Sequence, residues 1–219
     1  MDWDLFWSSL WPITREAIAG TIPLALVSFA LGLVLALLVA LARISRVRIL
    51  SLLAKAYISI IRGTPLLVQL FIIFYFFPSI GLLIDPWPSA VIAFSLNVGG
   101  YAAEVIRAAI LSVPKGQWEA GYTIGMSHTV TLRRIVLPQA ARVAVPPLSN
   151  TFISLVKDSS LASLILVTEL FRRAQEISAG SNEYLVIYIE AAAVYWVICL
   201  VLSAGQSHLE GRLDRYVAR

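Results

Sequence analysis

The amino-acid sequence predicts an all-α protein, a polytopic membrane helix bundle with about five transmembrane helices. Of its 219 residues, 59% are hydrophobic and only 14% are charged, whereas soluble domains are about half apolar and a quarter charged. The mean hydropathy of +0.82 is too high for one soluble core of this size to hide its apolar surface from water. The composition excludes intrinsic disorder, and a single cysteine, Cys199, excludes an internal disulfide. We therefore treat residues 1–219 as one membrane domain.

Uncharged apolar runs mark the expected spans, because a spanning helix needs about 20 mostly apolar residues. The clearest is residues 17–42, a run of 26 residues without a charge. Further spans are expected at residues 65–83, 88–111, 135–156 and 184–202. Pro146 and Pro147 lie within the fourth span, and we expect them to interrupt its helix.

Positive charges gather on one side of these spans. Of the 17 Lys and Arg residues, thirteen follow spans one, three and five, Arg62 among them. Cytoplasmic loops carry such an excess, so five spans place the N-terminus outside and the C-terminus in the cytoplasm. The acidic residues 2 and 4 fit an external start, and the chain lacks the positive start of a cleaved signal peptide. We expect the protein in the cytoplasmic (inner) membrane.

Two segments are expected to lie along the outer membrane surface rather than cross it. The first precedes span one and carries the aromatic residues Trp3, Phe6, Trp7 and Trp11. The second is residues 165–181, an amphipathic helix with two acidic and two basic residues. Aromatic and amphipathic segments prefer the membrane interface, which favours anchoring over any chemical role for both.

Residues 113–138 form a cytoplasmic segment too long for a tight turn. The residues before Gly125 can form two helical turns, and Gly125 can end them because glycine accepts the left-handed conformation. Ser127 or Thr129 can cap a second helix, which we expect to end against Pro138. The residues alone favour about equally a knob that docks a protein and a helix pair lying on the membrane surface.

The spacing within this segment is specific. Glu119, Ala120 and Gly121 are followed after three residues by Gly125 and, after nine more, by a run that includes Ile135, Leu137 and Pro138. This pattern resembles the EAA-type coupling loop of permease subunits of ABC importers. Gly121 stands where the family usually has alanine, a change that is expected to loosen the first helix by about 1 kcal/mol.

Other parts of the chain resemble the polar amino-acid branch of that family, with permeases for L-cystine uptake as the nearest likeness. The segments that carry it are residues 57–65, 95–97, 101–104, 137–142 and 152–162, and the resemblance covers about residues 15–210. It implies amino-acid transport by an importer, with cystine favoured and glutamine, arginine or histidine as alternatives.

The resemblance also implies partners. These are a second permease subunit (the same chain or a homologue), two cytoplasmic ATPase subunits that bind ATP-Mg, and an extracytoplasmic substrate-binding protein. The sequence agrees on one point by itself: it contains no Gly-x-x-x-x-Gly-Lys-Ser/Thr phosphate-binding loop. We therefore expect no cofactor, no metal and no catalytic residue in this chain, and no nucleic-acid partner.

Polar residues within the spans are the candidates for the substrate path, because polar groups in a bilayer usually face a cavity or a partner. Lys157 and Asp158 together offer both charges that an amino-acid zwitterion needs, although they could instead neutralise each other at the outer rim. Only one cation, Lys157, lies near this group, and a substrate with a positive side chain would need an additional acid there. The residues therefore favour a neutral or zwitterionic substrate. The predicted path residues are Gln69, Ser95, Asn97, Thr151, Ser154, Lys157 and Asp158.

Three further charged residues within the spans are not assigned to the path. Glu104 and Arg107 are three apart on one helix, a spacing that favours an ion pair with a structural or gating role. Glu190 could bond within the bundle, face a subunit interface or lie at the outer rim, and the sequence does not decide among these.

Two other classes of protein are less consistent with the sequence. A membrane redox subunit would need paired histidines within the bundle, but the only histidines, His128 and His208, lie outside the spans. A membrane enzyme would need clustered metal ligands or a nucleophile with its base at one depth, and neither pattern occurs. A self-sufficient secondary transporter commonly carries internal repeats and more spans.

Overall fold

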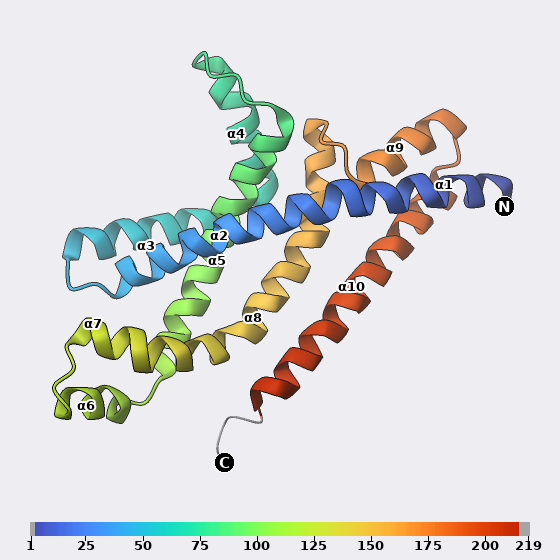
Figure 1. Ribbon diagram of the computed structural model, residues 1–219. Coiled ribbons are helices and arrows are strands. Elements are labelled where there is room, and N and C mark those ends of the chain that lie inside the picture. Colours follow the sequence, from blue (N-terminus) through green and yellow to red (C-terminus); the bar gives the residue numbers. More distant parts are fainter. Residues whose placement is uncertain (1–2, 215–219) are drawn as a thin grey trace.

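A computed structural model describes residues 3–214, and every regular element in that range is helical (Figure 1). The chain begins with α1 (Trp3–Glu16), a π-helical stretch η1 (Ala17–Thr21) and α2 (Ile22–Ile44). These run on as one helix from Asp4 to Ile44. The aromatic N-terminal residues are therefore part of the same helix as the first span, and Pro12 lies inside this helix without ending it.

The next two helices form a sharply bent pair. Helix α3 (Arg48–Gly63) packs along α2. The chain then bends by 105° between α3 and α4 (Leu66–Ser79) (Figure 1). Helix α3 was not predicted. Its signal was present, since Arg48, Lys55 and Arg62 recur every seven residues on one face, while the buried residues lie on another. Pro65 explains the bend, because the residue before a proline avoids the helical conformation.

Helix α5 (Pro86–Ser112) lies at the centre and packs against α2, α3, α4 and α8. Small residues allow this close packing. A Cβ on Gly99 would lie 2.7 Å from the hydroxyl of Tyr57, and a Cβ on Gly100 would lie 2.6 Å from a side-chain carbon of Ile61. The Tyr57 hydroxyl donates to the Leu96 carbonyl at 2.6 Å, which joins α3 to α5 by a direct hydrogen bond.

The 113–138 segment contains α6 (Lys115–Thr123), α7 (His128–Thr131), the π-helical turn η2 (Leu132–Val136) and the start of α8 (Leu137–Asp158). The prediction of a helix end at Pro138 is wrong, because the helix continues from α7 through η2 into α8. Pro138 lies inside this continuous helix, directly after the π-helical turn η2.

The predicted interruption at Pro146 and Pro147 is also wrong, since both lie inside α8. The prolines remove only their own two N–H donors, and membrane helices tolerate this where neighbouring groups compensate.

The chain then forms the 3-10 helix η3 (Ser159–Ile165), α9 (Leu170–Ser181) and the long α10 (Tyr184–Asp214). The predicted amphipathic segment 165–181 is helical from Leu170 onward. Helices α1 and α9 lie at one end of the bundle, and α6 and α7 lie at the opposite end (Figure 1).

The membrane-spanning part agrees with the prediction of about five spans. Three helices are long and apolar enough to cross a bilayer, and two bent pairs raise the number to five if each pair is one span. The bent pairs are α3 with α4 and the 128–165 helix with α9. Residues 1, 2, 215 and 219, used in the prediction of orientation, lie outside the described residues.

A fully buried glutamate joins three elements at the α9 end. The Glu169 carboxylate caps α9 by accepting from the Arg172 backbone N–H at 2.7 Å. It also accepts from the Tyr195 hydroxyl of α10 at 2.9 Å and from the Thr21 hydroxyl of η1 at 3.3 Å. Because buried carboxylates need such donors, Glu169 attaches α9 to the first and last helices.

Glu190 makes a second link at this end. It is 1% exposed on α10 and accepts from the Ser9 hydroxyl of α1 at 2.6 Å. Of the three possibilities left open for Glu190, the structure selects a hydrogen bond within the bundle.

Candidate functional site

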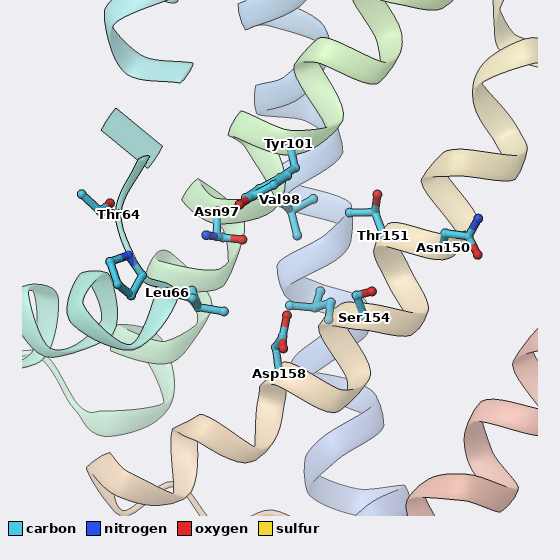
Figure 2. A pocket seen from close by; sticks show the side chains of 11 residues that line it. Thr64, Leu66, Asn97, Val98, Tyr101, Asn150, Thr151, Ser154 and Asp158 are labelled. Carbon is cyan, nitrogen blue, oxygen red and sulfur yellow. The ribbon is translucent and has the colours of Figure 1, made fainter. Parts of the chain in front are cut away.

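A polar cavity of about 390 Å³ lies between α5, α8 and the bend that joins α3 to α4. Figure 2 shows Asn97 and Tyr101 of α5 facing Thr151 and Asp158 of α8, with Thr64 of the bend at one side. Its volume falls in the range of ordinary small-molecule sites, about 300–1,000 Å³. The lining residues come from three chain segments that are far apart in the sequence, 64–66, 97–101 and 150–158.

Gln69 orients one wall of the cavity without lining it. Its side-chain nitrogen donates to the Ile61 carbonyl at 2.8 Å and to the Thr64 carbonyl at 3.1 Å. These carbonyls, at the end of α3, lack helix partners. Because a carbonyl can only accept, the Gln69 amide must turn its nitrogen toward these two groups. Its oxygen therefore faces α5, where it accepts from Asn97 Nδ2 at 3.1 Å. The Asn97 amide nitrogen is thereby engaged, and its Oδ1 is left as an acceptor for the cavity.

Asp158 is the only charged residue among those that line the cavity. Lys157, its neighbour, lines a different groove formed with α9 and α10. No ion pair between the two is present within residues 3–214. The cavity therefore offers two acceptor groups, the Asp158 carboxylate and Asn97 Oδ1, and is suited to a cationic group such as an ammonium.

The structure brings four of the seven predicted path residues to the cavity and places three elsewhere. Asn97, Thr151, Ser154 and Asp158 line it, and Gln69 lies behind Asn97. Ser95 is buried between helices, where its hydroxyl donates to the Ser28 carbonyl of α2 at 3.1 Å.

Sequence reasoning missed several residues at this site. Thr64, Tyr101 and Asn150 line the cavity, and the Arg62 guanidinium lies 5.4 Å from the centre of the Tyr101 ring. The sequence placed Arg62 among the cytoplasmic charges, but the structure places it beside Tyr101, which is near the middle of α5. This position of Arg62 depends on α3 and its bend, and neither was predicted from the sequence.

The 113–138 segment has the predicted helix–glycine–helix geometry. Gly125 has a φ of +79°, and its N–H donates to the Tyr122 carbonyl at 2.9 Å. The Met126 N–H donates to the Gly121 carbonyl at 3.0 Å, so the two bonds form the Schellman motif that ends many helices. The Ser127 hydroxyl accepts from the Val130 N–H and caps the second helix. The capping prediction is confirmed for Ser127.

Packing against α7 explains why glycine occupies position 121, which the sequence did not reveal. It is buried, and a Cβ added to it would lie 2.6 Å from Cγ2 and 2.7 Å from Oγ1 of Thr131 on α7. Alanine at this position would therefore collide with Thr131. The expected loosening of α6 by glycine is offset by this close contact between α6 and α7.

Side chains reinforce the contact between the two short helices. The rings of Trp118 and His128 are stacked with centres 4.9 Å apart, and the Tyr122 hydroxyl is 2.7 Å from His128 Nδ1. The predicted residues Glu119, Ala120, Gly125 and Pro138 are exposed on the segment, and Ile135 and Leu137 are partly buried.

An apolar cluster connects the segment to the membrane helices. Val113 and Val136 pack with Ala109 and Ile110 of α5 and with Ala140 of α8. Glu104 and Arg107 of α5 lie five and two residues before Ala109 of this cluster and form the predicted ion pair at 2.8 Å. The 113–138 segment is therefore attached to the same two helices that carry the cavity.

Residues 28–215 match the protein family described as "Binding-protein-dependent transport system inner membrane component". The chain belongs to this family. The match includes both the cavity and the 113–138 segment, so the two sites are parts of one membrane component of a binding-protein-dependent transport system. The predicted all-α membrane fold and the resemblance to ABC importer permeases are confirmed.

Individual relatives extend over nearly the whole chain. The chain is 66% identical over 218 residues to the L-cystine transport system permease protein TcyB of Bacillus subtilis, covering 99% of this chain and 93% of the relative. It is 41% identical over 212 residues to the glutamine transport system permease protein GlnP of Escherichia coli, covering 94% and 97%. These relatives are named as permease proteins, which agrees with a transport subunit rather than an enzyme.

Solved structures share the fold. A chain of a crystal structure of an amino acid ABC transporter with histidines superposes with a TM-score of 0.86 at 36% identity, covering 93% of this chain and 97% of that one. A chain of the inward-facing MetNI methionine ABC transporter reaches a TM-score of 0.73 at 19% identity, covering 97% and 99%. The second likeness concerns the fold alone.

Proposed function

We propose that this chain is the permease subunit of an ATP-driven importer for polar amino acids, and that the polar cavity is part of the substrate path. The observation that carries the proposal is the cavity itself, in which two acceptor groups lie between helices of a membrane protein, where polar side chains usually face a cavity or a partner. L-cystine is the first substrate to test, because the 66% identical relative is named for it.

The arrangement of polar groups suggests how an amino acid would lie. Its α-ammonium group would bind between the Asp158 carboxylate and Asn97 Oδ1. Its carboxylate would lie toward the Tyr101 hydroxyl and the Arg62 guanidinium at the cavity margin. Once Asp158 is engaged, no second acid is available among the lining residues, which favours a neutral side chain over the cationic side chain of arginine.

The proposed partners follow from the family. A second permease subunit, of the same chain or a homologue, would complete the path, and an extracytoplasmic binding protein would deliver the substrate. Two ATPase subunits would bind ATP-Mg and dock on the 113–138 segment through the exposed Glu119, Ala120 and Gly125. The chain has no phosphate-binding loop of its own, so ATP hydrolysis belongs to those subunits.

The test is uptake of labelled cystine, glutamine and arginine by vesicles that contain the assembled complex. Asp158→Asn keeps the shape of the side chain and removes its charge, and lost hydrogen bonds to charged groups cost about 1.5–3 kcal/mol. We therefore expect the substrate concentration for half-maximal uptake to rise about tenfold or more, while the ATPase subunits still co-purify.

The matched control is Asp85→Asn, the same chemical change between α4 and α5, and it should leave uptake unchanged. Unchanged cystine uptake by Asp158→Asn would remove the cavity from the path. Strong arginine uptake by the wild type would refute the preference for a neutral side chain.

The proposed orientation has an external N-terminus and a cytoplasmic C-terminus, and the positive-inside rule supports it. Single cysteines at Ser8 and Ser127, introduced in a Cys199→Ala background, should react with an impermeant reagent from opposite sides. Labelling of Ser127→Cys from outside intact cells would overturn the orientation.

A further inference from the structure

A second cavity lies outside the proposed substrate path. It is a groove of about 470 Å³ between the end of α8, the start of α9 and one face of α10. Aromatic side chains, among them Phe171, Tyr188 and Trp196, line part of it, and the small residues Ala192 and Cys199 are among the others. The groove thus combines a broad apolar surface with room beside α10.

Lys157 places a positive charge in this groove. No salt bridge to its ammonium group occurs in the part of the chain that the structure describes. The adjacent Asp158 faces the other cavity. A cation beside an apolar surface is stabilised by a nearby anion or by polar headgroups, and the residues that line this groove include no Asp or Glu.

The surroundings indicate that lipid supplies this partner. Trp196 is 64% exposed and Val201, further along α10, is 67% exposed. Such surface is stable against acyl chains. Lys157 lies in the last turn of α8, and Tyr184 and Tyr188 lie in the first two turns of α10. Tyrosine and lysine at helix ends are typical of headgroup depth.

We propose that this groove binds an anionic phospholipid. The lipid phosphate accepts hydrogen bonds from the Lys157 ammonium, and one acyl chain lies along Ala192 and Cys199 between the aromatic side chains. The site is separate from the proposed substrate path, and a zwitterionic lipid binds it more weakly because its own positive headgroup opposes Lys157.

Cys199 provides the measurement, because it lines the groove and is the only cysteine of the chain. The purified complex in detergent is supplied with phosphatidylglycerol or phosphatidylcholine, and the rate of maleimide reaction at Cys199 is followed on this chain. We expect phosphatidylglycerol to slow the reaction at lower concentrations than phosphatidylcholine does.

Variants identify the two parts of the site. Lys157→Gln should raise the phosphatidylglycerol concentration needed for protection about fivefold, and Lys157→Arg should keep protection near the wild-type level. Lys55→Gln, the same change on α3, is the matched control and should have no effect. Ala192→Phe should fill the groove, so that Cys199 reacts slowly without added lipid and protection no longer depends on the headgroup.

Four outcomes would overturn the proposal. Equal protection by both lipids, or by phosphatidylglycerol in Lys157→Gln as in the wild type, would mean that the headgroup charge is not recognised. Equal protection by inorganic phosphate would indicate ion binding alone. Protection without lipid that disappears when the two permease subunits are separated would assign the groove to a second copy.

Discussion

The 113–138 segment and the polar cavity are attached to the same helices, yet they depend on opposite features of their residues. In the segment, Gly121 and Gly125 matter because they have no side chain, which permits a close contact with Thr131 and a φ of +79°. In the cavity, Asn97 and Asp158 matter for the polar atoms at the ends of their side chains. Substitutions in the first region should therefore change assembly, and those in the second should change substrate affinity.

One element joins the two regions. The helix that begins at His128 continues to Ile165, and it carries both the second half of the segment and the cavity wall from Asn150 to Asp158. At about 1.5 Å per residue, a movement of the segment would reach Asp158 through about 45 Å of continuous helix. This continuity is the physical basis we propose for coupling between the ATPase subunits and the cavity.

The largest effect is expected for Gly125→Pro. Proline holds φ near −65° and cannot adopt the +79° found here, so the turn between α6 and α7 must rearrange. We expect ATP-driven uptake to be lost and the ATPase subunits to dissociate during purification. Gly125→Asn should retain much of both, because asparagine tolerates the left-handed conformation. Normal uptake and co-purification in Gly125→Pro would break the assignment of the segment to docking.

The second-largest effect is expected for Asn97→Leu, which changes the polar cavity rather than the 113–138 segment. It keeps a similar volume but removes the acceptor in the cavity and the donor to Gln69, and a lost buried hydrogen bond costs about 1–3 kcal/mol. Transport should weaken about tenfold or more, while expression and ATPase binding persist. Unchanged uptake would mean that Asn97 serves helix packing only.

Gly121→Ala tests whether packing outweighs helix propensity. Propensity alone predicts a gain of about 1 kcal/mol, but the added Cβ would lie 2.6 Å from the Thr131 side chain, and overpacking costs about 1–3 kcal/mol. We expect a lower thermal unfolding temperature of the complex and its recovery in the double variant with Thr131→Ala. A more stable single variant would show that propensity dominates.

The smallest effect is expected for Arg107→Gln, at the α5 end near the segment. The Glu104–Arg107 pair is about one quarter exposed, and such partly exposed pairs contribute up to about 1 kcal/mol. Uptake and ATPase co-purification should both stay within about twofold of wild type. A loss of uptake with intact assembly would instead assign a gating role to the pair.

Much of the fold and part of the site followed from local sequence signals. Apolar runs predicted the spans, and Gly125 with Ser127 predicted the turn between α6 and α7, because helix ends depend on neighbouring residues. Helix α3 was not predicted, because its amphipathic pattern has too few apolar residues for a membrane span. The interruption predicted at the prolines of α8 was wrong, because proline breaks helices in water more readily than within a packed membrane bundle.

By itself, the sequence determined that this protein is a membrane helix bundle with a helix–glycine–helix segment, because composition and short-range capping are local properties. Only the tertiary structure decided which polar residues meet. Lys157 and Asp158 are adjacent in the chain, but successive helical residues point about 100° apart, so one lines the apolar groove and the other the polar cavity. Gln69 and Asn97 are 28 positions apart and meet only because α4 packs against α5.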